Sequence, residues 1–282
     1  MKKPSLTADV VVIDGRPTYF WQRNPKAADS AVLVLHGFMA DYRSMEPFVT
    51  ALQVPPKTRV LLPDLPGFGA SEPLGDEPSV DDYVDWAVKF VRTVAPDIKQ
   101  LTIIGYSFGA YIAIVLASRG VLPLKKMTLI TPVVKITVPV QLYTSGFDSL
   151  AAVSMKAVTK LYTWQPNFDF TTYYLSKTKS REQKEKLKLH RRTELATLRP
   201  ELVLNLYRTL ADMDLLPYAG CIDVPVMVVM AQKDNLASNR STKQFIHRLR
   251  TYVYQTVVPR AGHLLPYEDP LLLAQLISRH GL

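Results

Sequence analysis

The chain reads Gly105-Tyr106-Ser107-Phe108-Gly109 between an apolar run at residues 101–104 and a helix-like run at residues 110–117. The β-branched residues before it are typical of a buried strand, and the segment after it has the composition of a buried helix. A G-x-S-x-G pattern between a strand and a helix predicts a nucleophile elbow, a sharp turn that lifts a serine hydroxyl out of a sheet. The alternative is an ordinary glycine-rich turn into a helix. We expect the elbow, with Ser107 as the nucleophile.

A serine hydroxyl needs a base to activate it and an acid to orient that base, in the chain order Ser, Asp or Glu, His. Asp234 is the predicted acid because it follows residues 224–231, an apolar run typical of a buried parallel strand. Ligand-facing residues collect beyond the carboxyl ends of such strands. Asp212 and Asp214 lie at an expected helix end, and Asp223 precedes the strand. The alternative for Asp234 is a polar turn residue.

His263 is the predicted base. It follows a strand-like run at residues 252–258, and Gly262 before it permits a tight loop. Pro266 is expected to prevent an early helix after it. The four competing histidines lie at a strand end, in a basic stretch, on an expected helix and near the carboxyl terminus: His36, His190, His247 and His280.

Two backbone N–H groups are predicted to form an oxyanion hole. One belongs to Phe108, the residue after the nucleophile. The other belongs to Phe38, in a loop that begins with His36 and Gly37 at the end of an earlier strand. Gly37 lets the backbone approach a substrate oxygen closely. The alternative is a simple strand-ending turn.

These motifs together resemble the α/β-hydrolase superfamily. Besides the elbow, the resemblance rests on His36-Gly37-Phe38, on Asp64-Leu65-Pro66-Gly67-Phe68-Gly69-Ala70-Ser71, on Asp234 and on Gly262-His263. It implies a mostly parallel sheet with helices on both faces and an inserted helical cap. It also implies that residues 64–71 form a structural loop beside the site. Serine at the elbow favours acyl chemistry over the aspartate-based chemistry of the superfamily's dehalogenases and epoxide hydrolases.

The overall composition bounds the class of protein. Hydrophobic residues make up 48% of 282 residues, typical of a globular protein. No run reaches the roughly 18 apolar residues of a membrane span, and no apolar region follows Met1-Lys2-Lys3 as in a signal peptide. We therefore expect a cytoplasmic protein without a transmembrane segment. Cys221 is the only cysteine, which excludes an intrachain disulfide.

The order of the expected elements divides the chain. A hairpin around residues 14–17 precedes strands that alternate with helices, which argues for a mostly parallel α/β sheet. The alternation breaks after residue 132 and resumes near residue 224. We predict a hydrolase core at residues 1–132 and 218–282, and a cap or lid insertion at residues 133–217.

The expected cap has an aromatic part that either lines an acyl-binding pocket or forms the core of the cap itself. Its members are Tyr143, Phe147, Tyr162, Trp164, Phe168, Phe170, Tyr173 and Tyr174.

A basic part of the expected cap follows and carries a formal +6 of the total of +9. It is either a solvated helix face or a landing surface for an acidic partner, such as an acyl-carrier protein or an anionic membrane. No motif for nucleic acid accompanies it. Against Glu182 and Glu185 it holds Lys177, Lys179, Arg181, Lys184, Lys186, Lys188, Arg191 and Arg192.

The predicted function is a serine hydrolase that cleaves carboxylic esters, with apolar acyl groups, through an acyl-enzyme. This mechanism needs no metal or organic cofactor. The same residues suit thioester, amide or C–C hydrolysis, or acyl transfer, and the basic part of the cap suits a thioesterase or an acyl-carrier-protein ester hydrolase. A ligand-binding receptor on a hydrolase scaffold is the alternative of another class. The sequence leaves the oligomeric state open.

Overall fold

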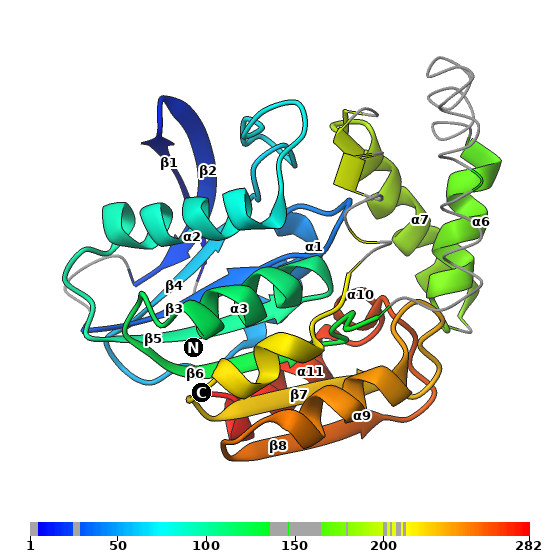
Figure 1. Cartoon of the computed structure of the whole chain (residues 1–282). Helices are drawn as coiled ribbons and strands as arrows, with labels where there is room; N and C mark the ends of the chain where they lie inside the picture. Colours follow the sequence, from blue (N-terminus) through cyan, green and yellow to red (C-terminus); the bar gives the residue numbers. More distant parts are fainter. Residues whose placement is uncertain are drawn as a thin grey trace.

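The computed structural model describes residues 5–24, 29–135, 146, 165–178, 180–199, 202–203, 205–206, 210 and 213–282, with the backbone alone for 165–168. One sheet of eight strands runs through this part of the chain in the order β1-β2-β4-β3-β5-β6-β7-β8 (Figure 1). The predicted hairpin forms its first edge, with β1 at Thr7–Ile13 antiparallel to β2 at Arg16–Arg23. Asp14 and Gly15, both at positive φ, make the turn between them.

The rest of the sheet is parallel from β4 onward. Strand β2 pairs antiparallel with β4 at Thr58–Pro63, and β4 pairs parallel with β3 at Ser30–Leu35. The remaining strands continue this direction: β5 at Gln100–Tyr106, β6 at Leu124–Ile130, β7 at Val226–Ala231 and β8 at Val253–Val258. Their carboxyl ends, and the loops that follow them, therefore meet at one edge of the sheet.

Helices cover both faces of this sheet, as predicted. On one face lie α2 at Val80–Val94, α3 at Phe108–Arg119 and α9 at Asn239–Arg248, which share a buried apolar cluster with the sheet. On the other face lie α1 at Tyr42–Ala51 and α11 at Pro270–His280, with a second buried cluster (Figure 1). Strands buried on both faces explain the near-continuous apolar runs of the sequence.

Local sequence accounts for the two helices beside the central strands. Helix α2 starts at a capping box in which Ser79 and Asp82 satisfy each other's backbone N–H groups. Its apolar stripe, including Tyr83 and Phe90, is buried against the sheet. Helix α3 is instead apolar on nearly all sides because it is enclosed, and it ends at Gly120 in the left-handed conformation.

Two helices of the expected cap lie beyond the carboxyl ends of the strands. They are α6 at Gln165–Leu175 and α7 at Arg181–Leu195, and Figure 1 shows them on the side to which the strands point. The 3₁₀ helix η1 at Leu216–Cys221 leads back to the sheet, and Cys221 is exposed. The division into a core and a cap at residues 133–217 remains our proposal.

The crossing of β5 and α3 depends on Gly105. A Cβ atom at this position would lie 2.6 Å from the Cα of Ala110 and 2.7 Å from its backbone nitrogen. We expect Gly105→Ala to lower the free energy of unfolding by about 1–3 kcal/mol or more, because overpacking there forces helix and strand apart. Exposed Gly75, where an added Cβ meets nothing within 4 Å, supplies the control Gly75→Ala, with a change within about 0.5 kcal/mol. Equal unfolding curves for the two variants in urea would contradict the tight crossing.

Candidate active site

Ser107 sits in a strained turn between β5 and α3. Its φ of 52° and ψ of −109° lie outside the regions that non-glycine residues normally occupy. Such a conformation costs about 1–3 kcal/mol and persists only where surrounding structure enforces it. Here Gly105 and Gly109 allow the close approach of backbone on both sides. The geometry is that of the expected elbow, and it excludes an ordinary glycine-rich turn.

The structure brings the three predicted residues into one hydrogen-bonded chain. The Nδ1 atom of His263 lies 2.8 Å from Oδ2 of Asp234, and its Nε2 atom lies 2.8 Å from Oγ of Ser107. All three side chains are buried or nearly so. A carboxylate can only accept, so Nδ1 carries the proton and Nε2 accepts from the serine hydroxyl. This is the tautomer in which His263 can take a proton from Ser107.

Asp234 is itself held in place by the backbone that follows it. Its Oδ1 accepts hydrogen bonds from the N–H groups of Leu236 and Ala237, at 2.9 and 2.8 Å, which leaves Oδ2 facing His263. The competing Asp214 is exposed and bonds the N–H of Leu216 at the start of η1. Asp212 lies outside the described residues.

The His263 loop is fixed from the sheet and from α6. The hydroxyl groups of Tyr106 and Thr131 donate to the carbonyl of His263 at 3.2 and 3.4 Å. The backbone N–H of His263 donates to the carbonyl of Leu175, the last residue of α6, at 2.9 Å. Glu268 then joins the two segments, because its carboxylate accepts from the N–H groups of Gly262 at 3.0 Å and Lys177 at 2.7 Å.

One expectation about this loop was wrong. Pro266 does not prevent an early helix, because the short helix α10 spans Leu265–Glu268 and holds Pro266 in its first turn. Proline is tolerated there, since the first N–H groups of a helix have no partner within it. The helix brings Glu268 back toward Gly262.

The competing histidines have other roles. His36 is fully buried, its Nδ1–H donates to the carbonyl of Gly37 at 2.8 Å, and its Nε2 accepts from the N–H of Leu65 at 2.9 Å. Burial lowers the pKa of His36, which favours the neutral ring that these bonds require. His190 on α7 lies 3.5 Å from Glu194. His247 and His280 are exposed.

The two predicted oxyanion donors, Phe38 and Phe108, line the same pocket as Ser107. Phe108 is the first residue of α3, where a backbone N–H has no acceptor within the helix. Phe38 follows Gly37, at which a Cβ atom would lie 2.8 Å from the ring of Tyr106. The peptide that carries the Phe38 N–H is the one whose carbonyl accepts from His36. His36 therefore orients this peptide, a role that its place at a strand end did not indicate.

The loop of residues 64–71 is structural, as the resemblance implied. The carboxylate of Asp64 accepts from the N–H groups of Tyr42 and Ala70, at 2.8 and 2.9 Å. Burial raises its pKa to about 7, although these two bonds act in the opposite direction. Asp64 thus ties the start of α1 to the loop beside Phe38.

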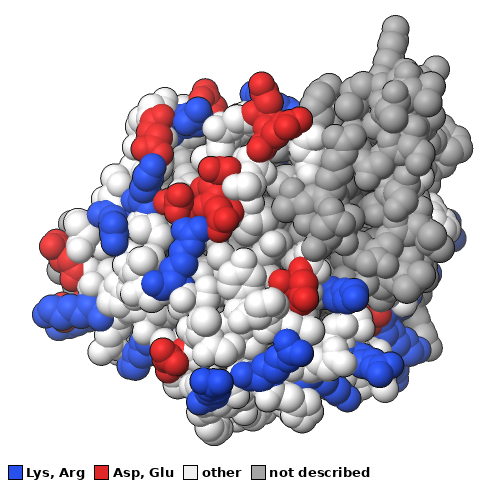
Figure 2. Space-filling model, in the orientation of Figure 1, with Lys and Arg blue, Asp and Glu red and all other residues white. Residues whose placement is uncertain are grey.

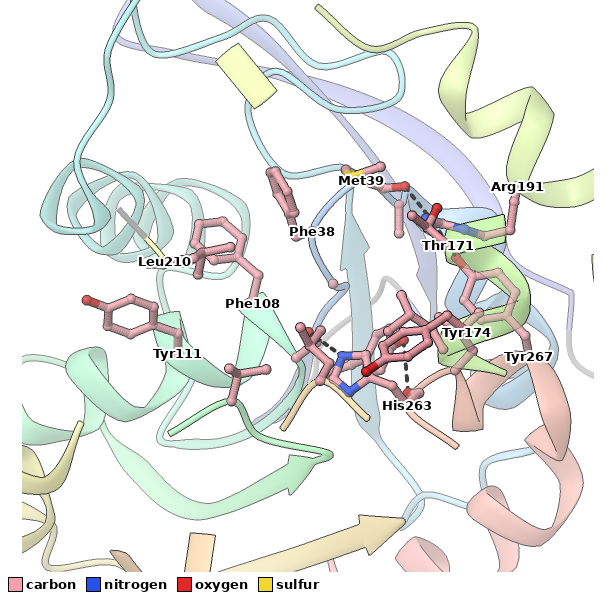
Figure 3. Close-up of a pocket in the computed structure, with 18 of the residues that line it drawn as sticks. Phe38, Met39, Phe108, Tyr111, Thr171, Tyr174, Arg191, Leu210, His263 and Tyr267 are labelled. Atoms are coloured by element: carbon pink, nitrogen blue, oxygen red, sulfur yellow. Dashed lines mark hydrogen bonds between the residues drawn. The ribbon is translucent and has the colours of Figure 1, made fainter. Parts of the chain in front are cut away.

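A pocket of about 250 Å³ opens at Ser107, and its lining is mostly apolar. Figure 3 shows Phe38, Phe108 and Leu210 along one side, with Tyr174, Arg191 and Tyr267 along the other and His263 at the base. Of the aromatic residues of the expected cap, Phe170 and Tyr174 line the pocket, and Tyr173 is exposed. Tyr143, Phe147, Tyr162, Trp164 and the side chain of Phe168 lie outside the described residues.

Four of the described residues in the basic part of the expected cap form ion pairs: Lys186, Lys188, Arg191 and Arg192. On α7, Lys188 and Arg192 both contact Asp169, at 3.1 and 2.8 Å, and Lys186 pairs with Glu182 at 2.6 Å. Lys179 lies outside the described residues. Figure 2 shows further positive side chains along the edge formed by β7, β8 and α9, where Arg240, Lys243, Arg248 and Arg250 are exposed. Exposed positive charge is therefore also found away from the basic part, and an acidic partner at the basic part stays a prediction.

Neither a metal cluster nor a membrane span is found in the part of the chain that the structure describes. There, no three His, Cys, Asp or Glu side chains gather as metal ligands would. No helix within the same residues combines the length and apolar character needed to cross a bilayer.

Comparison with known proteins identifies the family to which the chain belongs. The family model described as serine aminopeptidase, S33, matches residues 26–270. No curated protein sequence matches the chain.

Several solved structures are similar over nearly the whole chain. A thermophilic esterase from Thermogutta terrifontis has a TM-score of 0.77 at 18% identity, covering 98% of this chain and 97% of that one. An α/β hydrolase from a Medee basin deep-sea metagenome library has a TM-score of 0.75 at 19% identity, covering 95% of each. The enol-lactonase from Burkholderia xenovorans LB400 has a TM-score of 0.74 at 17% identity, covering 96% and 99%. At such identities the likeness establishes the fold, and the predicted α/β-hydrolase architecture is confirmed.

The Glu268 bridge predicts a variant with a specific defect. In Glu268→Gln one oxygen becomes an amide N–H₂ group that faces a backbone N–H, so one of the two bonds is lost. We expect the free energy of unfolding to fall by about 1–3 kcal/mol, and the kcat of hydrolysis to fall with it as the His263 loop loosens. Glu182→Gln, at an exposed ion pair, is the matched control, with a change below about 1 kcal/mol. Urea unfolding and steady-state kinetics measure both effects, and identical behaviour of the two variants would contradict the bridge.

Proposed function

Because the chain belongs to the serine aminopeptidase S33 family of α/β hydrolases, we propose that it is a serine hydrolase acting on carboxylic esters. The observation that carries this proposal is the unbroken chain of 2.8 Å contacts from Ser107 Oγ through His263 to Asp234. At its Ser107 end, this chain of contacts meets the mostly apolar pocket described above. A nucleophile, a base and an orienting acid in this relation are what acyl transfer requires.

In the proposed reaction, Ser107 Oγ attacks the ester carbonyl while His263 Nε2 takes the hydroxyl proton. Asp234 holds His263 in the required tautomer and stabilises the imidazolium ion that forms. His263 then gives the proton to the leaving alcohol, and an acyl-enzyme remains on Ser107. Water attacks that acyl group while His263 takes its proton, and His263 returns the proton to Ser107 Oγ as the acyl–oxygen bond breaks and the free carboxylic acid leaves. Proton and acyl group are thus accounted for without a cofactor.

The proposed oxyanion hole consists of the N–H groups of Phe38 and Phe108. Negative charge appears on the substrate oxygen only as the tetrahedral intermediate forms, so fixed donors stabilise the transition state more than the bound ester. The strained turn at Ser107 supports this assignment, because it places the serine directly before the start of α3, and the N-terminus of a helix favours negative charge. Each donor of this kind is worth about 10²–10³ in kcat.

The lining of the pocket favours an uncharged acyl group. Phe170, Tyr174 and Leu175 of α6 line one side, and Tyr111 of α3 and Leu210 line the other. An acyl chain placed among these residues loses contact with water and gains apolar contact. Esters are also the substrates that the names of the similar esterase and enol-lactonase indicate for those proteins. A carrier-protein thioester would need basic side chains on α7 to bind an acidic partner. Several of these side chains are paired with carboxylates of this chain, so we retain the simple ester as the proposed substrate class.

Replacement of the nucleophile is the direct test of this proposal. We expect Ser107→Ala to reduce turnover of p-nitrophenyl butyrate by several orders of magnitude, up to about 10⁶, because the attacking oxygen is lost. Labelling by a fluorophosphonate should be rapid in the wild-type protein and absent in the variant. Near-normal turnover in Ser107→Ala would reject the nucleophile. A folded wild-type protein that neither labels nor turns over esters would favour the ligand-binding receptor.

The apolar lining predicts a preference among acyl groups. Neutral p-nitrophenyl esters of four to eight carbons should have a kcat/KM at least about 10-fold above that of the mono-ester of succinate, whose free carboxylate would be buried without water. Steady-state kinetics on this series measures the preference. A succinate ester turned over as fast as the butyrate ester would show that the pocket accepts charge.

A further inference from the structure

A buried positive charge beside the pocket has no part in the proposed reaction of Ser107, His263 and Asp234. Arg191, on α7, is 6% exposed and lines the pocket among apolar side chains. A buried guanidinium is costly unless it is paired and hydrogen-bonded. Its Nη1 atom lies 2.9 Å from Oε2 of Glu194 and 3.5 Å from the hydroxyl of Tyr267, and it donates to the carbonyl of Met39 at 2.7 Å.

The charge of Arg191 is balanced within the protein. Glu194 is 1% exposed, and its carboxylate accepts from Arg191 and from the Tyr267 hydroxyl, at 2.9 and 3.0 Å. Burial, followed by the neighbouring Glu194, raises the pKa of Tyr267 well above its usual value, so this hydroxyl remains a donor. Since Glu194 already neutralises Arg191, an anionic substrate would gain little from the guanidinium. The remaining contact of Arg191 described above is its hydrogen bond to the carbonyl of Met39.

Met39 has a strained backbone directly after the proposed oxyanion donor. Its φ of 57° is in the left-handed region, which a non-glycine residue occupies at a cost of about 1–3 kcal/mol. It is not one of the residues that favour this region, and it is buried. Arg191 donates to the carbonyl of this strained residue, as the dashed line in Figure 3 shows.

We propose that Arg191 is a positioning residue that fixes the Phe38 loop from the cap, so that the oxyanion hole is complete only while α7 is in place. The loop is held at one end by His36, which bonds the Gly37 carbonyl, and at the other end by Arg191, which bonds the Met39 carbonyl. The Phe38 N–H lies between these two points. In this role Arg191 acts through its bond to the backbone of Met39. This inference rests on the proposed function and extends it to the cap.

The expected consequence is a loss confined to the transition state. A loosened Phe38 N–H would stabilise the tetrahedral intermediate less while leaving the binding of the neutral ester unchanged. We expect Arg191→Met to lower kcat for p-nitrophenyl butyrate by about 10–100-fold, less than the 10²–10³ for a whole donor, with KM within about threefold. Arg191→Lys keeps the positive charge but replaces the guanidinium by an ammonium group with fewer donors. It should therefore recover part of the kcat.

A matched control and a second ligand separate positioning from general loss of structure. Arg192→Met removes a charge from the same helix and breaks the ion pair with Asp169, but it leaves the Met39 contact intact, and kcat should stay within about twofold. An alkyl boronic acid, which forms a tetrahedral adduct on serine, should bind more weakly to Arg191→Met in proportion to the loss of kcat. Thermal unfolding of each variant reports the folded fraction.

Each outcome of this experiment decides the inference. Unchanged kcat and boronate affinity in folded Arg191→Met would overturn it, and so would an effect limited to the KM of an anionic ester, which would indicate a substrate receptor. If Arg191→Met does not fold, the pair Arg191→Met with Glu194→Gln removes both buried charges and gives the same test. Absence of Ser107-dependent turnover in the wild-type protein would instead reject the proposed function itself.

Discussion

The crossing of β5 and α3 at Ser107 is the constraint on which the rest of the site depends. Gly105 and Gly109 permit backbone atoms to approach where any side chain would collide, and the chain therefore turns within one residue. That residue takes a strained conformation, and buried strand and helix on either side supply the packing that holds it. This one turn places Ser107 in the lining of the pocket, directly before the start of α3. His263 and Asp234 then need only lie on loops at the same edge of the sheet.

The parts of the site that the sequence predicts are those with a local signature. Ser107, Asp234 and His263 each follow an apolar run and a turn, and parallel strands bring such turns to one edge. The role of Pro266 was misjudged because proline is excluded from helix interiors but not from the first turn of a helix. The role of His36 could not be predicted either. Its Nδ1–H bonds the Gly37 carbonyl because its Nε2 accepts from the N–H of Leu65, which lies 29 positions further along the chain.

The contacts that the sequence could not indicate come mostly from the expected cap. Asn235, beside the acid, donates to the carbonyl of Tyr174, and His263 donates to that of Leu175. These bonds use backbone carbonyls, which every residue possesses, so no residue type identifies them in advance. Their partners are separated by some sixty to ninety positions along the chain. Hydrophobic periodicity specifies which face of a helix is buried, but it does not specify which carbonyl meets which loop.

These contacts change the part that the cap plays in the proposed reaction. A lid that only covered a pocket would need apolar contacts alone, and a buried ion pair such as Arg191 with Glu194 would be a poor way to stabilise it, since well-packed apolar residues usually do as well or better. Directional bonds are useful where a precise orientation matters more than net stability. The expected cap bonds three loops of the site. Tyr174 accepts from Asn235 beside Asp234, Leu175 accepts from the N–H of His263, and Arg191 donates to the Met39 carbonyl beside Phe38. In the proposed reaction, the segment that lines the pocket would therefore also position the acid, the base and the Phe38 loop, so that a change made for one purpose would affect the other.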